Sequence, residues 1–236
     1  MSKSWRRQLS EKFMFGKVLR IFRFDDLLKI ARSVRPGISV ALVERYLDEM
    51  EGLLFKRAPD GLILNSAVFP PVTIGDAVSV LIDGAVVSLH TVLGDRGVLN
   101  NYTKNMVCVR PKSISFEVVE AEYDGGSIKC FPVDDALFSV GEYHDRFDRT
   151  YLYPRATAEA AIIHWFWLIK HEVGPFRSME TQVDLEDVDL ECVYRMAEPF
   201  GLVDDIKEWV RLVKEREDYD DNERWRDTPK TSGPSM

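Results

Sequence analysis

The sequence predicts an α+β fold, and three patterns lead to this prediction. Apolar residues recur at helical spacing through the first fifty positions, short runs of β-branched and aromatic residues lie between residues 105 and 131, and a nearly apolar helix pattern spans residues 157–170. Phe69-Pro70-Pro71 suits a short linker, because each proline restricts the residue before it. We therefore expect an N-terminal domain at 1–67, a larger domain at 72–216 with a small antiparallel sheet and a buried central helix, and a disordered tail at 217–236.

The net charge of −8 is unevenly distributed along the chain. Through Ala67 there are 13 Lys and Arg against 8 Asp and Glu, whereas the remainder has 18 against 31. The basic front suits a polyanion, and the acidic remainder would repel one but could attract a basic protein surface. Ordinary solvated surface explains the same asymmetry, so composition alone leaves both interpretations open.

The chain is expected to be cytoplasmic and to make no contact with a membrane. Its first residues do not form a charged-then-apolar leader, and its longest apolar run is shorter than the roughly 18 residues that a bilayer span needs. The cysteines are odd in number, far apart and in apolar surroundings, which suits reduced, buried thiols: Cys108, Cys130 and Cys192.

Three helices are expected first, at residues 11–22, 24–34 and 39–51. Arg35-Pro36-Gly37 is a turn that no helix would continue through. Asp25 can cap the second helix and Ser39 can cap the third. Gly52 can end the third helix. Residues 53–57 and 62–65 then read as two short strands around the turn Pro59-Asp60-Gly61. Three helices and a hairpin predict a winged helix-turn-helix.

Such a module usually binds DNA. The third helix would meet the major groove, and basic residues of the first helix and of the wing would lie near phosphates. The predicted DNA-binding residues are Arg6, Arg7, Lys12, Ser39, Arg45, Lys56 and Arg57. Glu44, Asp48 and Glu49 on the third helix oppose a phosphate backbone, so a protein-protein role for the module stays open.

The larger domain is expected to begin with a helix at 74–82 and a second helix that Ser88 caps and Gly97 ends. Antiparallel strands should follow at 105–110, 115–120, 127–131 and 149–153, with Asp124-Gly125-Gly126 as a turn. Thr157 caps the central helix, whose residues from Ile162 to Ile169 leave almost no polar face. After it, a helix should begin at Asp184 or Asp187 and break near Pro199, and another should span 203–216.

No catalytic, cofactor or metal site is predicted, and the chain is not expected to be an enzyme. Ser88, His90 and Asp95 are the residue types of a nucleophilic triad, but helix spacing turns Ser88 and His90 to different faces. The remaining histidines lack a tight ligand pair: His144, His164 and His171.

The order of these parts resembles the antitoxins of abortive-infection toxin-antitoxin systems, the AbiEi-like family. The winged helix ends in Gly52-Leu53-Leu54, and residues 87–98 resemble the family's capped serine helix, with Arg96 where the family more often has histidine. Residues 156–162 resemble the family's Ser-Pro-Glu-Lys-Ala-Leu helix start, with Thr157, Ala158 and Ala160 at the Ser, Pro and Lys positions. The chain would be a divergent member.

The resemblance implies a phage-defence antitoxin that counteracts a nucleotidyltransferase-like toxin and represses its own operon by binding double-stranded promoter DNA. It would be a transcriptional regulator without catalysis. The alternative is a protein-interaction subunit whose winged helix docks a partner protein, and an unrecognised hydrolase or nuclease is a third hypothesis. The operator, the toxin, the mode of neutralisation and the oligomeric state stay open.

Overall fold

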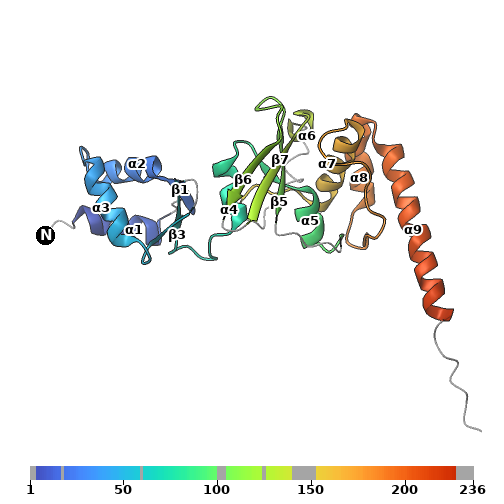
Figure 1. Cartoon of the computed structure of the whole chain (residues 1–236), viewed down its shortest axis with the longest axis horizontal. Helices are drawn as coiled ribbons and strands as arrows, with labels where there is room; N and C mark the ends of the chain where they lie inside the picture. Colours follow the sequence, from blue (N-terminus) through green and yellow to red (C-terminus); the bar gives the residue numbers. More distant parts are fainter. Residues whose placement is uncertain are drawn as a thin grey trace, which may run out of the picture.

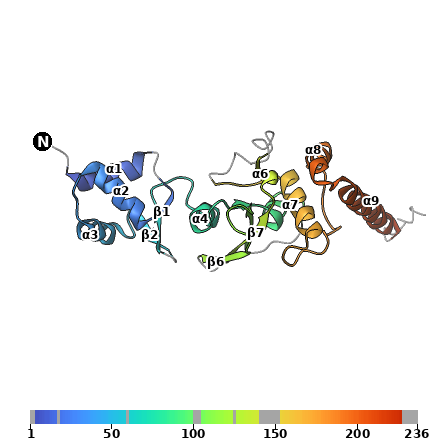
Figure 2. The ribbon, with the colours of Figure 1, turned by 90° about the horizontal axis from the view of Figure 1, so that it is seen from above.

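The computed structural model describes residues 4–16, 19–58, 61–99, 105–123, 126–139 and 153–226. These residues form a mixed α+β structure, which confirms the predicted class. The elements lie in a row along the long axis of the molecule, with the first three helices at one end and the last helix, α9, at the other (Figure 1). The view from above shows the same arrangement (Figure 2).

The N-terminal module comprises three helices and a three-stranded antiparallel sheet of order β1-β3-β2. Its elements in chain order are α1 (Trp5–Phe15), β1 (Ile21–Arg23), α2 (Phe24–Val34), α3 (Val40–Met50), β2 (Phe55–Arg57) and β3 (Leu62–Asn65). Four aromatic rings form the centre of its core, since Phe13 lies 5.1 Å from Phe22 and 4.9 Å from Phe55, and Phe55 lies 6.1 Å from Tyr46. These edge and tilted contacts fix how α1, α3 and the sheet pack.

The predicted first helix at 11–22 is wrong in its bounds. The helix begins at Trp5 and ends at Phe15, and Ile21 and Phe22 belong to β1. Both apolar residues are buried, because opposite faces of β1 are covered by two different cores. The cap of α2 also differs, since the Asp26 carboxylate and not that of Asp25 accepts from the Arg23 backbone N–H at 3.2 Å. Pro59 and Asp60 of the predicted turn lie outside the described residues.

The C-terminal body, from α4 to α9, contains a four-stranded sheet of order β4-β5-β7-β6. Its first elements are α4 (Ile74–Leu81), β4 (Val86–Val87), α5 (Leu89–Asp95), β5 (Met106–Pro111), β6 (Val119–Tyr123), β7 (Gly126–Val133) and α6 (Ala136–Ser139). The expectation of an antiparallel sheet holds for β4–β5 and β6–β7 and is wrong for the central pair, β5–β7, which is parallel.

The strand pairing follows from which strand of the β6–β7 hairpin is more apolar. In β7, Ile128, Cys130, Phe131 and Val133 are buried, whereas Glu120 of β6 is exposed. The more apolar strand therefore takes the inner position beside β5, and β6 takes the edge. The predicted strand at 115–120 starts only at Val119, and residues 149–152 of the predicted fourth strand lie outside the described residues.

The central helix is α7 (Ala158–Lys170), and its residues from Ala160 to Leu168 are all buried. The predicted cap is confirmed, because the Thr157 hydroxyl accepts from the Ala160 N–H at 3.2 Å. The following helix, α8 (Leu190–Ala197), begins later than predicted because its N-terminal cap is Asp189, and a 3₁₀ turn at Glu198–Phe200 breaks it as expected.

The last helix, α9 (Val203–Arg226), is longer than predicted. Residues 217–226, which were expected in a disordered tail, are helical, and 227–236 lie outside the described residues. The first half of α9 packs against the body through four buried residues, namely Ile206, Trp209, Val210 and Val213. Arg211 pairs with Glu208 and Glu215 along the exposed face, and pairs at these spacings support a helix that packs on one side only.

The N-terminal module is joined to the body by more than the linker. One face of its sheet contributes Ile21, Leu62 and Leu64 to the large core of the body, and β1 contacts α4. Beside them, the Arg20 Nε donates to the Asp76 carboxylate of α4 at 2.5 Å, and both side chains are largely buried. The predicted boundary near residues 68–71 therefore lies within a packed region, and the exact domain bounds stay a prediction.

No helix in the described ranges is both long and apolar enough to span a membrane.

Candidate nucleic-acid interface

The third helix of the N-terminal module exposes one face while its opposite face is packed. Val43, Tyr46 and Leu47 are buried, so residues at positions 41, 44, 45 and 48 of α3 face solvent. The turn between α2 and α3 is fixed by Gly37, which has a φ of 78°, and by the buried side chain of Ile38. A helix, a tight turn and a second helix thus present a polar surface on a rigid support.

Three of the predicted arginines form ion pairs within the module. Arg6 of α1 pairs with Glu49 of α3, and Arg57 of β2 pairs with Asp48 and, at 3.3 Å, with Glu51. Within α1, Arg7 pairs with Glu11 at 3.1 Å. Lys12 donates instead to the Ser33 hydroxyl at 3.0 Å.

The three remaining predicted residues are exposed: Ser39, Arg45 and Lys56. Ser39 precedes α3 at the capping position, as predicted, but its hydroxyl makes no capping hydrogen bond. Arg45 forms no ion pair among the described residues, and the same holds for Arg35 in the turn before α3. Sequence reasoning missed Arg35 because it treated Arg35-Pro36-Gly37 only as a helix breaker, although a cation beside a helix N-terminus was visible there.

The internal ion pairs lower the positive potential of the exposed face of α3, but they hold the two arginine side chains only weakly. The paired side chains are between 38% and 64% exposed in the Arg6–Glu49 and Arg57–Asp48 pairs. Exposed pairs of this kind contribute about 0–1 kcal/mol, because water screens them and long side chains lose entropy when held. A phosphate oxygen could therefore compete with either carboxylate for its arginine at little cost.

Ser88, His90 and Asp95 do not come together as a triad. The Ser88 hydroxyl lies 2.8 Å from Nδ1 of His164 on α7. It makes no capping hydrogen bond to α5, so the predicted cap is wrong. Asp95 accepts instead from the buried Arg155 guanidinium at 2.8 Å. Ser88 and His164 are 0% and 1% exposed, so this pair joins two elements inside the core.

His90 packs its ring against aromatic neighbours, with Trp165 at 4.1 Å and Phe176 at 5.9 Å between ring centroids. Burial lowers the pKa of His90, while the nearby Glu180 carboxylate acts in the opposite direction. His171 stacks on Trp167 with centroids 4.1 Å apart, and burial lowers its pKa as well. Both rings therefore favour the neutral form.

Within the described ranges, no group of three or more His, Cys, Asp or Glu side chains is placed to hold a metal ion. His144 lies outside those ranges. Cys108 and Cys130 are register partners on β5 and β7, and both are buried free thiols. Burial raises the pKa of Cys130 to about 12, so this thiol stays protonated near neutral pH.

No protein-family model matches the chain, and no curated protein matches it. Function is therefore inferred from the geometry of the N-terminal module and from the motifs named above.

Proposed function

We propose that the chain is a DNA-binding antitoxin and transcriptional autoregulator whose N-terminal module is a winged helix-turn-helix. The observation that carries the DNA-binding part is the order α1, β1, α2, α3, β2, β3 together with the sheet order β1-β3-β2. In that arrangement α2 and α3 are the helix-turn-helix, and β2 and β3 are the wing.

In the proposed complex, α3 enters the major groove of a promoter duplex. Ser39 and Arg45 approach base edges or nearby phosphates, and Arg35 and Lys56 lie toward the backbone on either side. Arg6 and Arg57 exchange Glu49 and Asp48 for phosphate oxygens. Each exchange replaces a weak exposed pair with a contact that also releases counterions from the DNA.

The antitoxin part of the proposal is supported by the resemblance in residues 87–98 and 156–162. Both segments contribute apolar residues to the core of the body, where Ser88 contacts His164 and Thr157 caps α7. A nucleotidyltransferase-like toxin is the partner that the resemblance implies, and the cytoplasm is the compartment where both would act.

Fluorescence anisotropy with a labelled duplex from the chain's own promoter tests the DNA-binding proposal. Alanine at both Lys56 and Arg57 should weaken binding about tenfold or more, and Arg45→Ala should do so by a similar factor. Lys214→Ala on α9 removes one positive charge far from α3 and should leave the affinity unchanged. Full affinity in the Lys56/Arg57 double variant would exclude the proposed wing.

The second candidate function is a protein-docking module, and the ion pairs favour it. Asp48, Glu49 and Glu51 pair with Arg6 and Arg57, so the exposed face carries charges of both signs and is not a purely basic surface.

Glu49→Gln separates the two candidates. A DNA reader should bind duplex several-fold more tightly once this carboxylate is neutral, because Arg6 is released and repulsion of phosphate falls. A module that docks only protein should show no duplex binding in either form.

A further inference from the structure

The exposed face of α3 carries four charged side chains, and two of them pair with arginines of neighbouring elements. Asp48 pairs with an arginine of β2, and Glu49 pairs with an arginine of α1. The other two, Glu44 and Arg45, are exposed and form no ion pair among the described residues. A ligand that approaches α3 can therefore contact Glu44 and Arg45 without first breaking an ion pair.

The turn of α3 that precedes these two residues is short-chained and uncharged at its surface. Ser39, Val40 and Ala41 are exposed, and the first turn contains no acidic residue. Their short side chains let a duplex approach the backbone of α3 closely. Close approach brings the longer side chains of Glu44 and Arg45 within reach of base edges in a major groove.

Helix geometry separates the two side chains from each other. Glu44 and Arg45 are consecutive, so they point about 100° apart around the axis of α3. Both nevertheless face solvent, because Val43 and Tyr46 on either side of them in the sequence are the buried positions. Two side chains that diverge in this way contact different base edges when the helix lies in a groove.

We propose that Glu44 and Arg45 set the base preference of α3 by reading two neighbouring base pairs. Arg45 donates to O6 and N7 of a guanine, and Glu44 accepts from the N4 amino group of a cytosine. A carboxylate in any other position of the interface would face phosphates and weaken binding. This assignment rests on the proposed function, because it places α3 in the major groove of a duplex.

Selection from a pool of duplexes with a randomised central segment tests the assignment without knowledge of the promoter. The full chain is mixed with the pool, and the bound duplexes are recovered and sequenced. The wild-type chain should enrich a motif that contains two adjacent G·C pairs.

Two variants should change this motif in different ways. Arg45→Ala should lose the preference for guanine at one position and bind the enriched motif about tenfold or more weakly. Glu44→Gln should select adenine where the wild type selects cytosine, because a glutamine amide pairs with the edge of adenine. It should also bind a duplex of unrelated sequence several-fold more tightly, because repulsion of phosphate falls.

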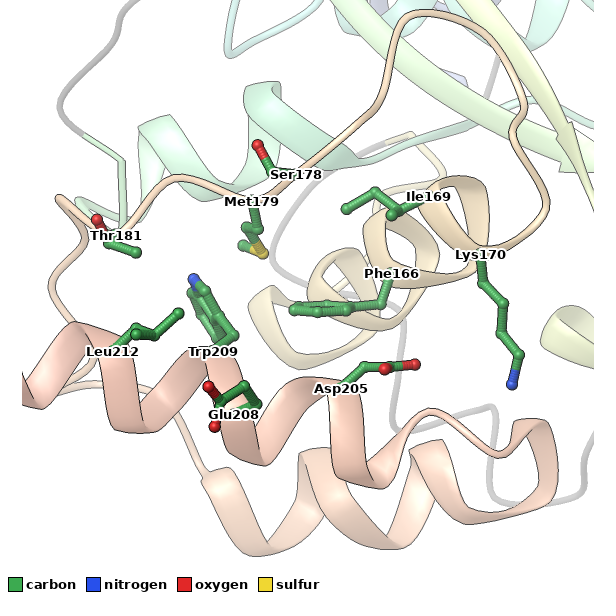
Figure 3. A pocket seen from close by; sticks show the side chains of 10 residues that line it. All are labelled: Phe166, Ile169, Lys170, Ser178, Met179, Thr181, Asp205, Glu208, Trp209 and Leu212. Atoms are coloured by element: carbon green, nitrogen blue, oxygen red, sulfur yellow. The ribbon is translucent and has the colours of Figure 1, made fainter.

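Asp205→Asn is the matched control for the loss of a carboxylate. Asp205 lies on α9 at the wall of the pocket between α7 and α9 (Figure 3), and α9 and α3 lie at opposite ends of the molecule (Figure 1). Its side chain is exposed and, like that of Glu44, forms no ion pair among the described residues. This variant should keep both the motif and the affinity of the wild type, because salt screens charges over such a distance.

The outcomes separate this assignment from DNA binding itself. A motif without adjacent G·C pairs, or one that Glu44→Gln and Arg45→Ala both leave unchanged, would overturn the assignment and leave DNA binding intact. If the wild-type chain enriches no duplex at all, the proposed function fails and the base assignment fails with it. Circular dichroism of each variant checks that the fold is retained.

Discussion

At the scale of single residues, Gly174 occupies a position that no other residue fits. Its φ is 67°, in the left-handed region, and a Cβ atom there would lie 2.5 Å from the Phe131 ring. Phe131 is itself packed edge-on against Phe176 at 4.9 Å, so the ring has little room to move. The turn after α7 therefore depends on glycine for both its backbone and its contact with β7.

Gly174→Ala should lower the free energy of unfolding by about 3 kcal/mol, because backbone strain and overpacking add. Gly97→Ala is the matched control: its φ is 76°, but no atom lies within 4 Å of the added Cβ. It should cost only about 1 kcal/mol. Urea unfolding of both variants measures the difference, and equal losses would show that the contact with Phe131 contributes nothing.

The Ser88–His164 contact shows what sequence could not reveal about single residues. Position and residue type predicted a helix cap, and a helix does begin after Ser88. The hydroxyl nevertheless bonds to a histidine 76 positions away, because a buried imidazole nitrogen needs a partner inside the core. Pairing across that separation depends on how α5 and α7 pack, which local pattern does not encode.

At the scale of elements, the N-terminus of α7 is capped by one side chain, that of Thr157. Thr157→Ala removes the oxygen that accepts from the Ala160 N–H, and it should cost about 1 kcal/mol, or about 2–4 °C in Tm. Thr157→Ser keeps the oxygen and should retain most of the stability. Thermal unfolding by circular dichroism compares the three proteins, and an alanine variant as stable as the serine variant would contradict the capping role.

Whether a segment is a helix or a strand was largely predictable from the sequence, but the pairing of the strands and the ends of the elements were not. The strand-like runs at 105–110 and 127–131 are β5 and β7, yet their parallel pairing depends on which strand of a hairpin is more apolar. The end of α9 was missed because the low apolar content of residues 217–226 predicted disorder, although the helix continues through Arg226. In the N-terminal module, β3 was predicted to the residue because its apolar run has clear bounds.

At the scale of the whole molecule, the N-terminal module and the body share apolar packing and one buried ion pair. Asp76 accepts from Arg20 and also from the N–H and hydroxyl of Thr73, at 2.7 and 3.0 Å. Arg20 in turn donates to the carbonyls of Pro70 and Pro71. These contacts, with Ile21, Leu62 and Leu64 in the core of the body, should make the two parts unfold together.

Asp76→Asn should lower stability by about 3 kcal/mol, because it leaves a largely buried guanidinium without its counter-ion. It should also turn a single thermal transition into two. Combining it with Arg20→Met removes the unpaired charge, so the double variant should lose less than the sum of the single losses. Calorimetry measures both effects, and strictly additive losses would mean that the pair does not couple the two parts.

The direct test of the central claim is the affinity of the full chain for its own promoter duplex, measured by anisotropy across a series of salt concentrations. The logarithm of the binding constant should fall linearly as the logarithm of salt concentration rises, with a slope that reports several phosphate contacts. Absence of binding at low salt, or an affinity that does not change with salt, would contradict a DNA-reading N-terminal module.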